Sequence, residues 1–186
     1  ELNNIDLSFG DKQIIKDFSL YTVEGEIVSL LGTNGSGKSS LMKIATGLLK
    51  ADQGEVIING ISMEKDPQKA LQQMSAQIEE PVFYEEMTAL DNLYLFSSMK
   101  GSNKEDADYY LEKFGLTEHK KKKVRKFSIG MRRRLQLAIC LSYKADLYIL
   151  DEPFSGLDYQ AVELLENILH EIKERGASMI TSSHQS

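Results

Sequence analysis

The stretch GTNGSGKS at residues 32–39 has the pattern G-x-x-x-x-G-K-[ST], which constrains the fold more than any other part of the chain. The apolar run Glu26–Leu31 before it predicts a buried strand, and the apolar spacing from Lys38 to Leu49 predicts a helix. Glycines between a strand and a helix let consecutive backbone N–H groups converge, and a helix N-terminus favours an anion. We therefore predict a phosphate-binding loop, whose residues are Gly32, Thr33, Asn34, Gly35, Ser36, Gly37, Lys38, Ser39 and Ser40.

Two side chains of this loop and two later carboxylates predict how a phosphate chain is held. The Lys38 ammonium would reach the outer phosphates, and the Ser39 hydroxyl would take one position on Mg²⁺. Such a site needs a carboxylate from a second strand, and the apolar residues 147–150 are followed by Asp151 and Glu152. Asp151 would orient the metal ion, while Glu152 could polarise an attacking water as a general base. These residues predict Mg²⁺-dependent chemistry on a phosphate chain.

Strands and helices alternate along the first and last thirds of the chain, around a helix-rich middle. This order predicts an α/β fold with a core sheet and an inserted helical part. We expect one domain over residues 1–186, with its core at about 1–79 and 143–186 and its helical part at about 80–142. The predicted strands are 18–23, 26–31, 54–60, 147–150 and 178–182, and the predicted helices are 38–49, 66–76, 88–114, 128–142 and 162–172.

The composition excludes several other classes of protein. The chain has 186 residues, a formal net charge of −6 and one cysteine, Cys140, so it cannot form an internal disulfide. No apolar run approaches the roughly 20 residues that cross a bilayer. Nine Lys and Arg residues lie between Lys120 and Arg134 without an acidic residue among them. We interpret this block as a solvated face and expect no nucleic acid as a partner, because no series of aromatic residues accompanies the charges.

Four further motifs resemble those of ATP-binding cassette (ABC) proteins and stand in the order that this family shows. FSIGM at residues 127–131 resembles the LSGGQ signature at Ser128 and Gly130, and RRRL follows it. The chain is therefore similar to the nucleotide-binding domain of an ABC transporter. The other matching residues are Asp158, which ends the D-loop motif SGLD and would link two sites across a dimer, His184 as the switch histidine, and Phe9 as the aromatic residue that stacks on adenine.

The resemblance implies a P-loop NTPase core with an antiparallel β portion and an inserted helical subdomain that carries the signature. It implies ATP and Mg²⁺ as ligands, and ATP hydrolysis with Lys38, Glu152 and His184 as catalytic residues. Two copies would meet head to tail, so that Ser128 and Gly130 of one copy contact the ATP of the other. A transmembrane permease would be a further partner, which implies a cytoplasmic protein, peripheral at the inner face of the cell membrane.

The sequence departs from the family pattern at three places. Glu79 stands in the slot of the glutamine that contacts Mg²⁺ when Pro81 and the residues after it are aligned, and this pattern resembles bacterial bacitracin and lantibiotic exporters. Gln77 is the alternative for that role. Ile129 replaces a glycine of the signature. The chain ends two residues after His184, whereas family members continue, so we expect that a C-terminal part is missing.

Three functions remain to be weighed. The first is the ATPase subunit of a membrane transporter, an exporter by resemblance, whose permease docks at Glu79–Met87 where Phe83 and Tyr84 are expected to be exposed; alternatively, Phe83 packs inside. The second is a soluble ABC ATPase that acts on ribosomes or nucleic acid, which the single phosphate loop and the absence of a sustained heptad disfavour. The third is a kinase or GTPase, which would need neither the signature nor His184.

Overall fold

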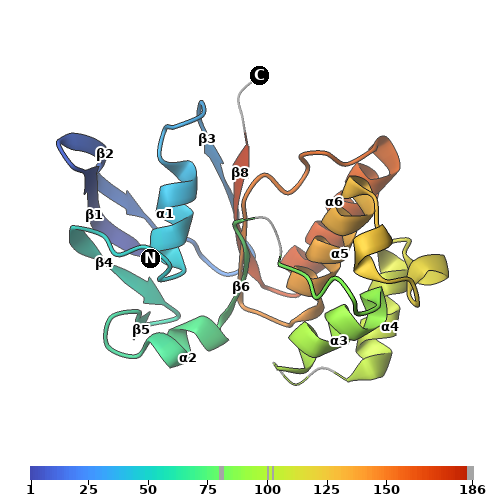
Figure 1. Ribbon diagram of the computed structural model, residues 1–186. Helices are drawn as coiled ribbons and strands as arrows, with labels where there is room; N and C mark the ends of the chain where they lie inside the picture. The colour runs from blue at the N-terminus through green and yellow to red at the C-terminus, as the bar shows by residue number, and fades with distance from the viewer. Residues whose placement is uncertain (80–81, 100, 102, 184–186) are drawn as a thin grey trace. The chain divides into compact units, whose positions relative to one another are not determined.

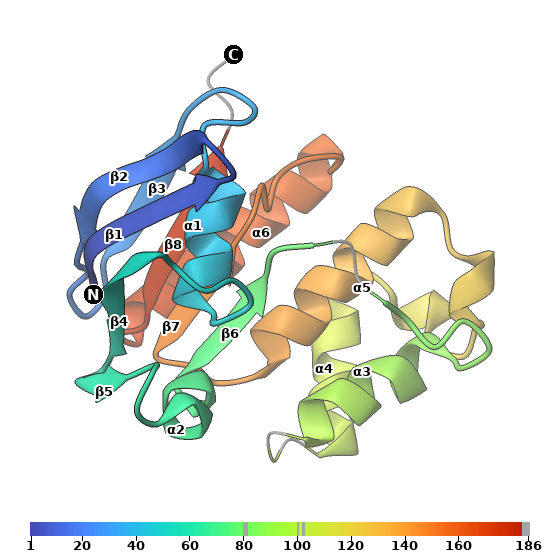
Figure 2. The same ribbon diagram turned by 60° about the vertical axis from the view of Figure 1, so that its left-hand side comes forward.

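The computed structural model describes residues 1–79, 82–99, 101 and 103–183 (Figures 1 and 2). These residues form two compact units. The first unit contains residues 1–78, 145–153 and the chain from Ile172 onward, and the second contains residues 79–144 and 154–171. Residues 154–171, which the sequence places with the core, thus group with the helical residues instead.

An antiparallel sheet in the order β2-β1-β4-β5 forms one half of the first unit. Strands β1 (Leu2–Phe9) and β2 (Lys12–Leu20) make a hairpin, where the sequence predicted only a strand from Phe18 to Val23. The hairpin was missed because its register shifts at several points and its alternation is broken. Asn4 and Asp17 both have positive φ at these irregularities. The other two strands are β4 (Gln53–Ile58) and β5 (Ile61–Ser62).

A parallel sheet in the order β3-β8-β7-β6 forms the other half of the first unit. Its strands are β3 (Ile27–Leu31), β6 (Met74–Gln77), β7 (Leu147–Leu150) and β8 (Ser178–Ser183). The helix predicted at 66–76 is wrong in its second half, because α2 (Pro67–Gln72) ends before β6 begins. A four-residue strand is too short to show a period of two clearly against a helical period.

Helix α1 (Lys38–Ala45) packs its apolar side against both sheets of the first unit (Figure 2). Its buried residues Leu41, Met42 and Ile44 join a core to which β1, β4 and β7 also contribute. The helix ends four residues before the predicted Leu49, since Gly47 adopts a left-handed conformation just after it. Burial of this stripe holds the start of α1 next to the end of β3.

The second unit is helical. The run predicted at 88–114 consists of two helices, α3 (Ala89–Ser98) and α4 (Lys104–Lys113), and Asn103 starts the second with a capping box. Two short 3₁₀ turns, η1 (Thr117–His119) and η2 (Val124–Lys126), lead to α5 (Ile129–Ser142). Helix α6 (Tyr159–Glu174) begins in this unit and ends in the first. Among the described residues, no helix is both long and apolar enough to cross a membrane.

Candidate functional site

The loop of residues 32–37 joins β3 to α1 and depends on its glycines. Gly35 and Gly37 have φ of +78° and +96°, which side chains with a Cβ rarely adopt. A Cβ on Gly37 would also lie 3.1 Å from the Ile14 side chain, and one on Gly32 would lie 2.7 Å from Ser36 Oγ. The loop therefore needs glycine both for its backbone angles and for its close contacts.

Lys38 folds back over this loop from the first residue of α1. Its Nζ donates hydrogen bonds to the carbonyl oxygens of Gly32, at 2.6 Å, and Thr33, at 3.0 Å. The ammonium at the start of the loop and the N-terminus of α1 at its end both place positive charge at this loop. An anion with several oxygens, such as a polyphosphate, matches this arrangement.

Ser39 meets the carboxylate that follows β7. Its Oγ donates a hydrogen bond of 2.7 Å to Oδ2 of Asp151. The Asp151 backbone is fixed by the parallel ladder, since its N–H donates to the carbonyl oxygen of Gln77 at 2.7 Å. The structure thus brings together a hydroxyl and a carboxylate that lie 112 residues apart in the chain. Both are oxygen ligands of the kind that Mg²⁺ prefers.

Glu152 and Asp151 both form a hydrogen bond with Ser182 on β8. The Glu152 N–H donates to Ser182 Oγ at 2.9 Å, and Ser182 Oγ donates to Oδ1 of Asp151. Glu152 has a φ of +48°, in the left-handed region that is unfavourable for a residue with a side chain. Sequence reasoning missed Ser182, although its position at the carboxyl end of a parallel strand next to β7 could have indicated it.

Gln77 and Glu79 have different surroundings. The Gln77 side chain is 5% exposed, and its Nε2 donates to the Asp151 carbonyl oxygen at 3.4 Å. Its Oε1 is buried and has no hydrogen-bond partner among the described residues. Glu79 is exposed and belongs to the second unit, where its carbonyl oxygen accepts a hydrogen bond of 2.7 Å from Gln136. Within the first unit, Gln77 is therefore the candidate that lies beside Asp151.

A cavity of about 330 Å³ opens beside the loop, in the size range of small-molecule sites. Lys12 and Ile14, two residues apart on β2, are lining residues that the sequence did not single out, although the alternation of a strand turns both to one side. No group of three or more His, Cys, Asp or Glu among the described residues could hold a metal ion alone. Mg²⁺ commonly takes one or two protein ligands together with phosphate oxygens. The other lining residues are Phe9, Asn34, Gly35, Ser36, Gly37, Lys38, Ser39, Ser40 and Glu152.

The remaining predicted residues lie in the second unit or outside the described chain. Ser128 is the N-cap of α5, and its Oγ accepts the Met131 N–H at 3.3 Å. Asp158 accepts the Ala161 N–H at 2.8 Å at the start of α6. Ile129 is 85% exposed, and a Cβ on Gly130 would meet nothing within 4 Å. His184 lies outside the described residues.

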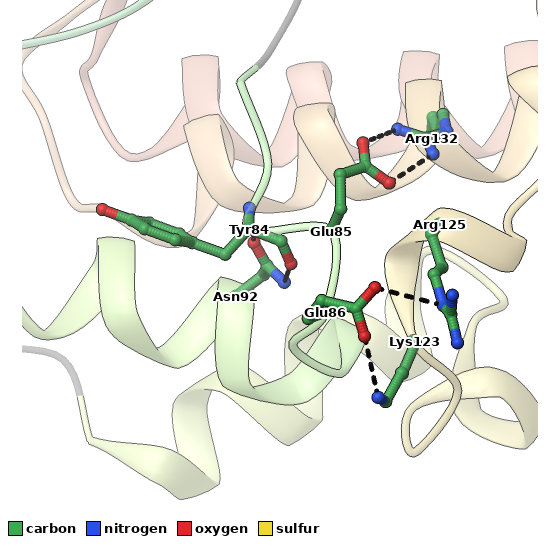
Figure 3. Close-up of polar contacts among 7 residues, drawn as sticks. All are labelled: Tyr84, Glu85, Glu86, Asn92, Lys123, Arg125 and Arg132. Atoms are coloured by element: carbon green, nitrogen blue, oxygen red, sulfur yellow. Dashed lines mark hydrogen bonds and ion pairs between the residues drawn. The ribbon is translucent and has the colours of Figure 1, made fainter.

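Four of the nine basic residues in the block of residues 120–134 pair with carboxylates of the same unit, and Figure 3 shows three of these four. The Arg132 guanidinium donates to both carboxylate oxygens of Glu85, at 2.6 and 2.7 Å. Glu86 pairs with Lys123 at 2.9 Å and with Arg125 at 3.3 Å. Further along the block, Lys120 pairs with Asp108 at 2.7 Å.

Comparison with known proteins identifies the family. Residues 15–155 match the sequence family described as ABC transporter. The chain is 39% identical over 186 residues to YhcH of Bacillus subtilis, an uncharacterised ABC transporter ATP-binding protein; the match covers 99% of this chain and 61% of YhcH. It is 34% identical over 184 residues to the lantibiotic transport ATP-binding protein SrtF of Streptococcus pyogenes, covering 99% of this chain and 79% of SrtF.

The fold agrees with a solved structure of the same kind. A dimeric post-hydrolysis state of the ATP-binding cassette MJ0796 with ADP and Pi matches with a TM-score of 0.88 and 25% identity, over 99% of this chain and 87% of that one. The chain therefore belongs to the ABC transporter family, which confirms the prediction from its motifs, and the predicted P-loop NTPase fold is confirmed as well. The chain spans about 60% of the length of YhcH.

Proposed function

We propose that this chain is the ATP-binding and ATP-hydrolysing part of a subunit that energises a membrane transporter, specifically an exporter. The observation that carries the proposal is the meeting of Ser39, Asp151 and Glu152 beside the cavity that the phosphate loop lines. The relative SrtF, whose name assigns it to lantibiotic transport, favours a transporter over the other functions of this family. Transport of a peptide antibiotic is the specific form of the proposal that this relative supports.

The residues of the first unit have separate tasks in this reaction. The loop N–H groups and the Lys38 ammonium bind the triphosphate, and Phe9 stacks on the base. Ser39 and Asp151 would hold Mg²⁺, with Gln77 or Glu79 as a further oxygen ligand, and the ion would supply charge neutralisation on the phosphates. The Glu152 carboxylate accepts a proton from the water that attacks the γ-phosphate. His184 is proposed to donate a hydrogen bond to the same phosphate.

The residues of the second unit are proposed to act on the ATP of another copy. The Ser128 hydroxyl accepts one hydrogen bond from its own helix and still has its proton to donate, so it can bond a phosphate oxygen as well. Gly130 leaves open space for close approach. Asp158 would link the two sites of such a dimer, and the dimeric state of the MJ0796 cassette supports this arrangement.

A transmembrane permease is the proposed partner, which would hold the protein in the cytoplasm at the inner face of the membrane. The proposed docking segment is Glu79–Met87. Of its two aromatic residues, Phe83 is buried, which is the alternative that the sequence left open, so it is not an exposed anchor. Phe83 is 7% exposed, and the Arg132 guanidinium lies 6.0 Å from the centre of its ring. Tyr84 remains exposed and is the residue that could contact a permease.

Action on ribosomes or nucleic acid is the alternative function, and its main support in the sequence was the basic block. Three carboxylates, Glu85, Glu86 and Asp108, pair with four of the nine basic residues of that block within the second unit. Phosphate binding along a nucleic acid needs basic groups that are available to release counterions. The pairing therefore favours the transporter.

ATP turnover by the full-length protein, purified with and without its membrane fraction, tests the proposal. We expect Mg²⁺-dependent hydrolysis that falls about 10²-fold or more in Glu152→Gln, because the general base is lost while the amide retains the shape. Glu163→Gln, an exposed carboxylate on α6, is the matched control and should keep the native rate. Hydrolysis by Glu152→Gln at the native rate would refute the base assignment. If the full-length protein is recovered together with ribosomes and not with a polytopic membrane protein, the proposed role in a transporter is refuted.

A further inference from the structure

Ser182 is a buried hydroxyl between the two carboxylate residues of the site. It lies on β8, is 2% exposed, and is not among the described residues that line the cavity. Its oxygen accepts the Glu152 N–H at 2.9 Å and its proton goes to Oδ1 of Asp151. The hydroxyl is therefore used both as donor and as acceptor, and both partners belong to the candidate site.

These two hydrogen bonds act on different features of the site. The bond to Oδ1 of Asp151 leaves Oδ2 for the Ser39 hydroxyl, so one oxygen of the carboxylate is held by strand β8 and the other by helix α1. The bond from the Glu152 N–H holds the backbone nitrogen of Glu152, the residue that itself has the unfavourable φ of +48°. Removal of the hydroxyl would leave a buried N–H and a carboxylate oxygen each with one partner fewer.

We propose that Ser182 is a positioning residue, whose hydroxyl fixes the Asp151 carboxylate and the Glu152 backbone relative to each other. In this role it does not touch the nucleotide. It fixes the position of the proposed metal-holding oxygen of Asp151 relative to the proposed general base, Glu152. The inference rests on the proposed function, since it needs Asp151 and Glu152 in those roles. It adds a residue on β8 that neither the motifs nor the sequence comparison identifies.

The consequence is a separation between binding and turnover. Nucleotide binding depends on the loop N–H groups and Lys38, which Ser182 does not contact. A shift of the Glu152 carboxylate by about 1 Å is enough to lower a rate about 10²-fold, because general-base catalysis depends on orientation. Loss of the hydroxyl should therefore lower kcat strongly and leave the dissociation constant for ATP nearly unchanged.

Ser182→Thr and Ser182→Val form the matched pair that tests this, because threonine and valine have the same shape and differ in the hydroxyl. In the full-length protein, we expect Ser182→Thr to keep most of the native kcat and Ser182→Val to lose about 10²-fold. ATP affinity, measured by titration of a fluorescent ATP analogue, should change less than about threefold in both variants. The Mg²⁺ concentration for half-maximal turnover should rise in Ser182→Val only.

Ser178→Ala controls for a general loss of stability. Ser178 is also buried on β8, but its Oγ donates to the Val23 carbonyl oxygen, at 2.7 Å and away from the two carboxylates. We expect it to lower the melting temperature without lowering kcat. If the methyl group of Ser182→Thr prevents folding, Ser182→Ala compared with Ser178→Ala makes the same comparison without added bulk.

Two results would overturn the role of Ser182 alone, and a third kind of result would overturn the proposed function on which that role rests. Equal turnover in Ser182→Thr and Ser182→Val would show that the hydroxyl has no role. A kcat that falls equally in Ser182→Val and Ser178→Ala would show a purely structural effect. Native protein without ATPase activity, or Glu152→Gln with native activity, would overturn the proposed function itself, whereas the first two results leave it standing.

Discussion

The residues around the two proposed ATP-contacting parts of the chain are held in different ways. In the first unit, the Asp151 carboxylate accepts hydrogen bonds from Ser39 on α1 and from Ser182 on β8, a strand whose register with β7 is fixed. In the second unit, Ser128 and Asp158 each cap their own helix, and the surrounding segments are joined by exposed ion pairs. The side chains of the first group are therefore positioned by one another before any ligand binds. The side chains of the second group are positioned by the helices that they cap.

This difference predicts that one group of residues determines how tightly a single chain binds ATP, and that the other determines how tightly two copies associate. A group that is preorganised by a sheet can bind phosphate with little rearrangement, which favours binding by a single chain. A cap residue such as Ser128 can add a bond to a phosphate only when another copy presents one. The loop should therefore control affinity for ATP, and the signature should control association of two copies.

The largest effect is expected from Lys38→Ala. Removing the ammonium beside the carbonyl oxygens of Gly32 and Thr33 should weaken ATP binding by about 10²-fold, because a positive charge facing a polyphosphate is lost. Titration with a fluorescent ATP analogue measures this. Lys12→Ala removes the same charge from another part of the cavity lining and should have a smaller effect. Equal losses in the two variants would show that only the overall charge matters.

A smaller effect is expected from Ser128→Ala, measured in the Glu152→Gln background so that ATP is not consumed. ATP-dependent dimerisation, followed by sedimentation, should weaken about tenfold while binding of ATP to one chain is unchanged. The variant also loses a helix cap, which costs about 1 kcal/mol. Thr88→Ala removes a cap of the same kind from α3 and is the control. Equal loss of dimer in both variants would contradict a phosphate contact.

The smallest effect is expected from the Glu85–Arg132 pair, because Glu85 is exposed and Arg132 is partly exposed to solvent and salt. Hydrogen bonds from Arg132 hold the pKa of the Glu85 carboxyl below its ordinary value of 4.5. The stabilisation from the pair is therefore fully present above pH 4.5 and disappears as the pH falls through the lowered pKa. An NMR titration of the Glu85 carboxyl measures that pKa, and Arg132→Gln should return it to the ordinary value. An unchanged pKa in Arg132→Gln would contradict the pairing.

The sequence predicted the first group of residues more completely than the second. The loop and the Asp151 strand follow from local patterns, since glycines, a buried apolar run and a terminal carboxylate are all adjacent in the chain. Ser182 does not follow, because its role depends on β8 lying next to β7, and this pairing joins residues about 30 positions apart. Strand β6 was also missed, so the burial of Gln77 could not be foreseen.

The second group shows the opposite difficulty. The sequence left open whether Phe83 is exposed or packed; it is buried, and the Arg132 guanidinium lies 6.0 Å from the centre of its ring. The basic block was visible in the sequence, whereas its carboxylate partners Glu85, Glu86 and Asp108 come from segments 12 to 47 residues away. A run of charged residues can be seen in the sequence, but only the fold shows which of these side chains form ion pairs.

Because the backbone of Glu152 is left-handed, substitutions that raise the stability of the protein at this position are expected to lower its activity. A residue with a side chain at φ +48° carries strain that glycine or asparagine would relieve. Part of the gain from glycine would be offset by the greater freedom of its unfolded chain. A library of variants screened only for heat resistance would therefore tolerate or enrich glycine or asparagine at this position, and either of them would delete the carboxylate that we propose as the general base. Screens on this protein should select for turnover at the same time, or they will favour stable chains that lack the proposed base.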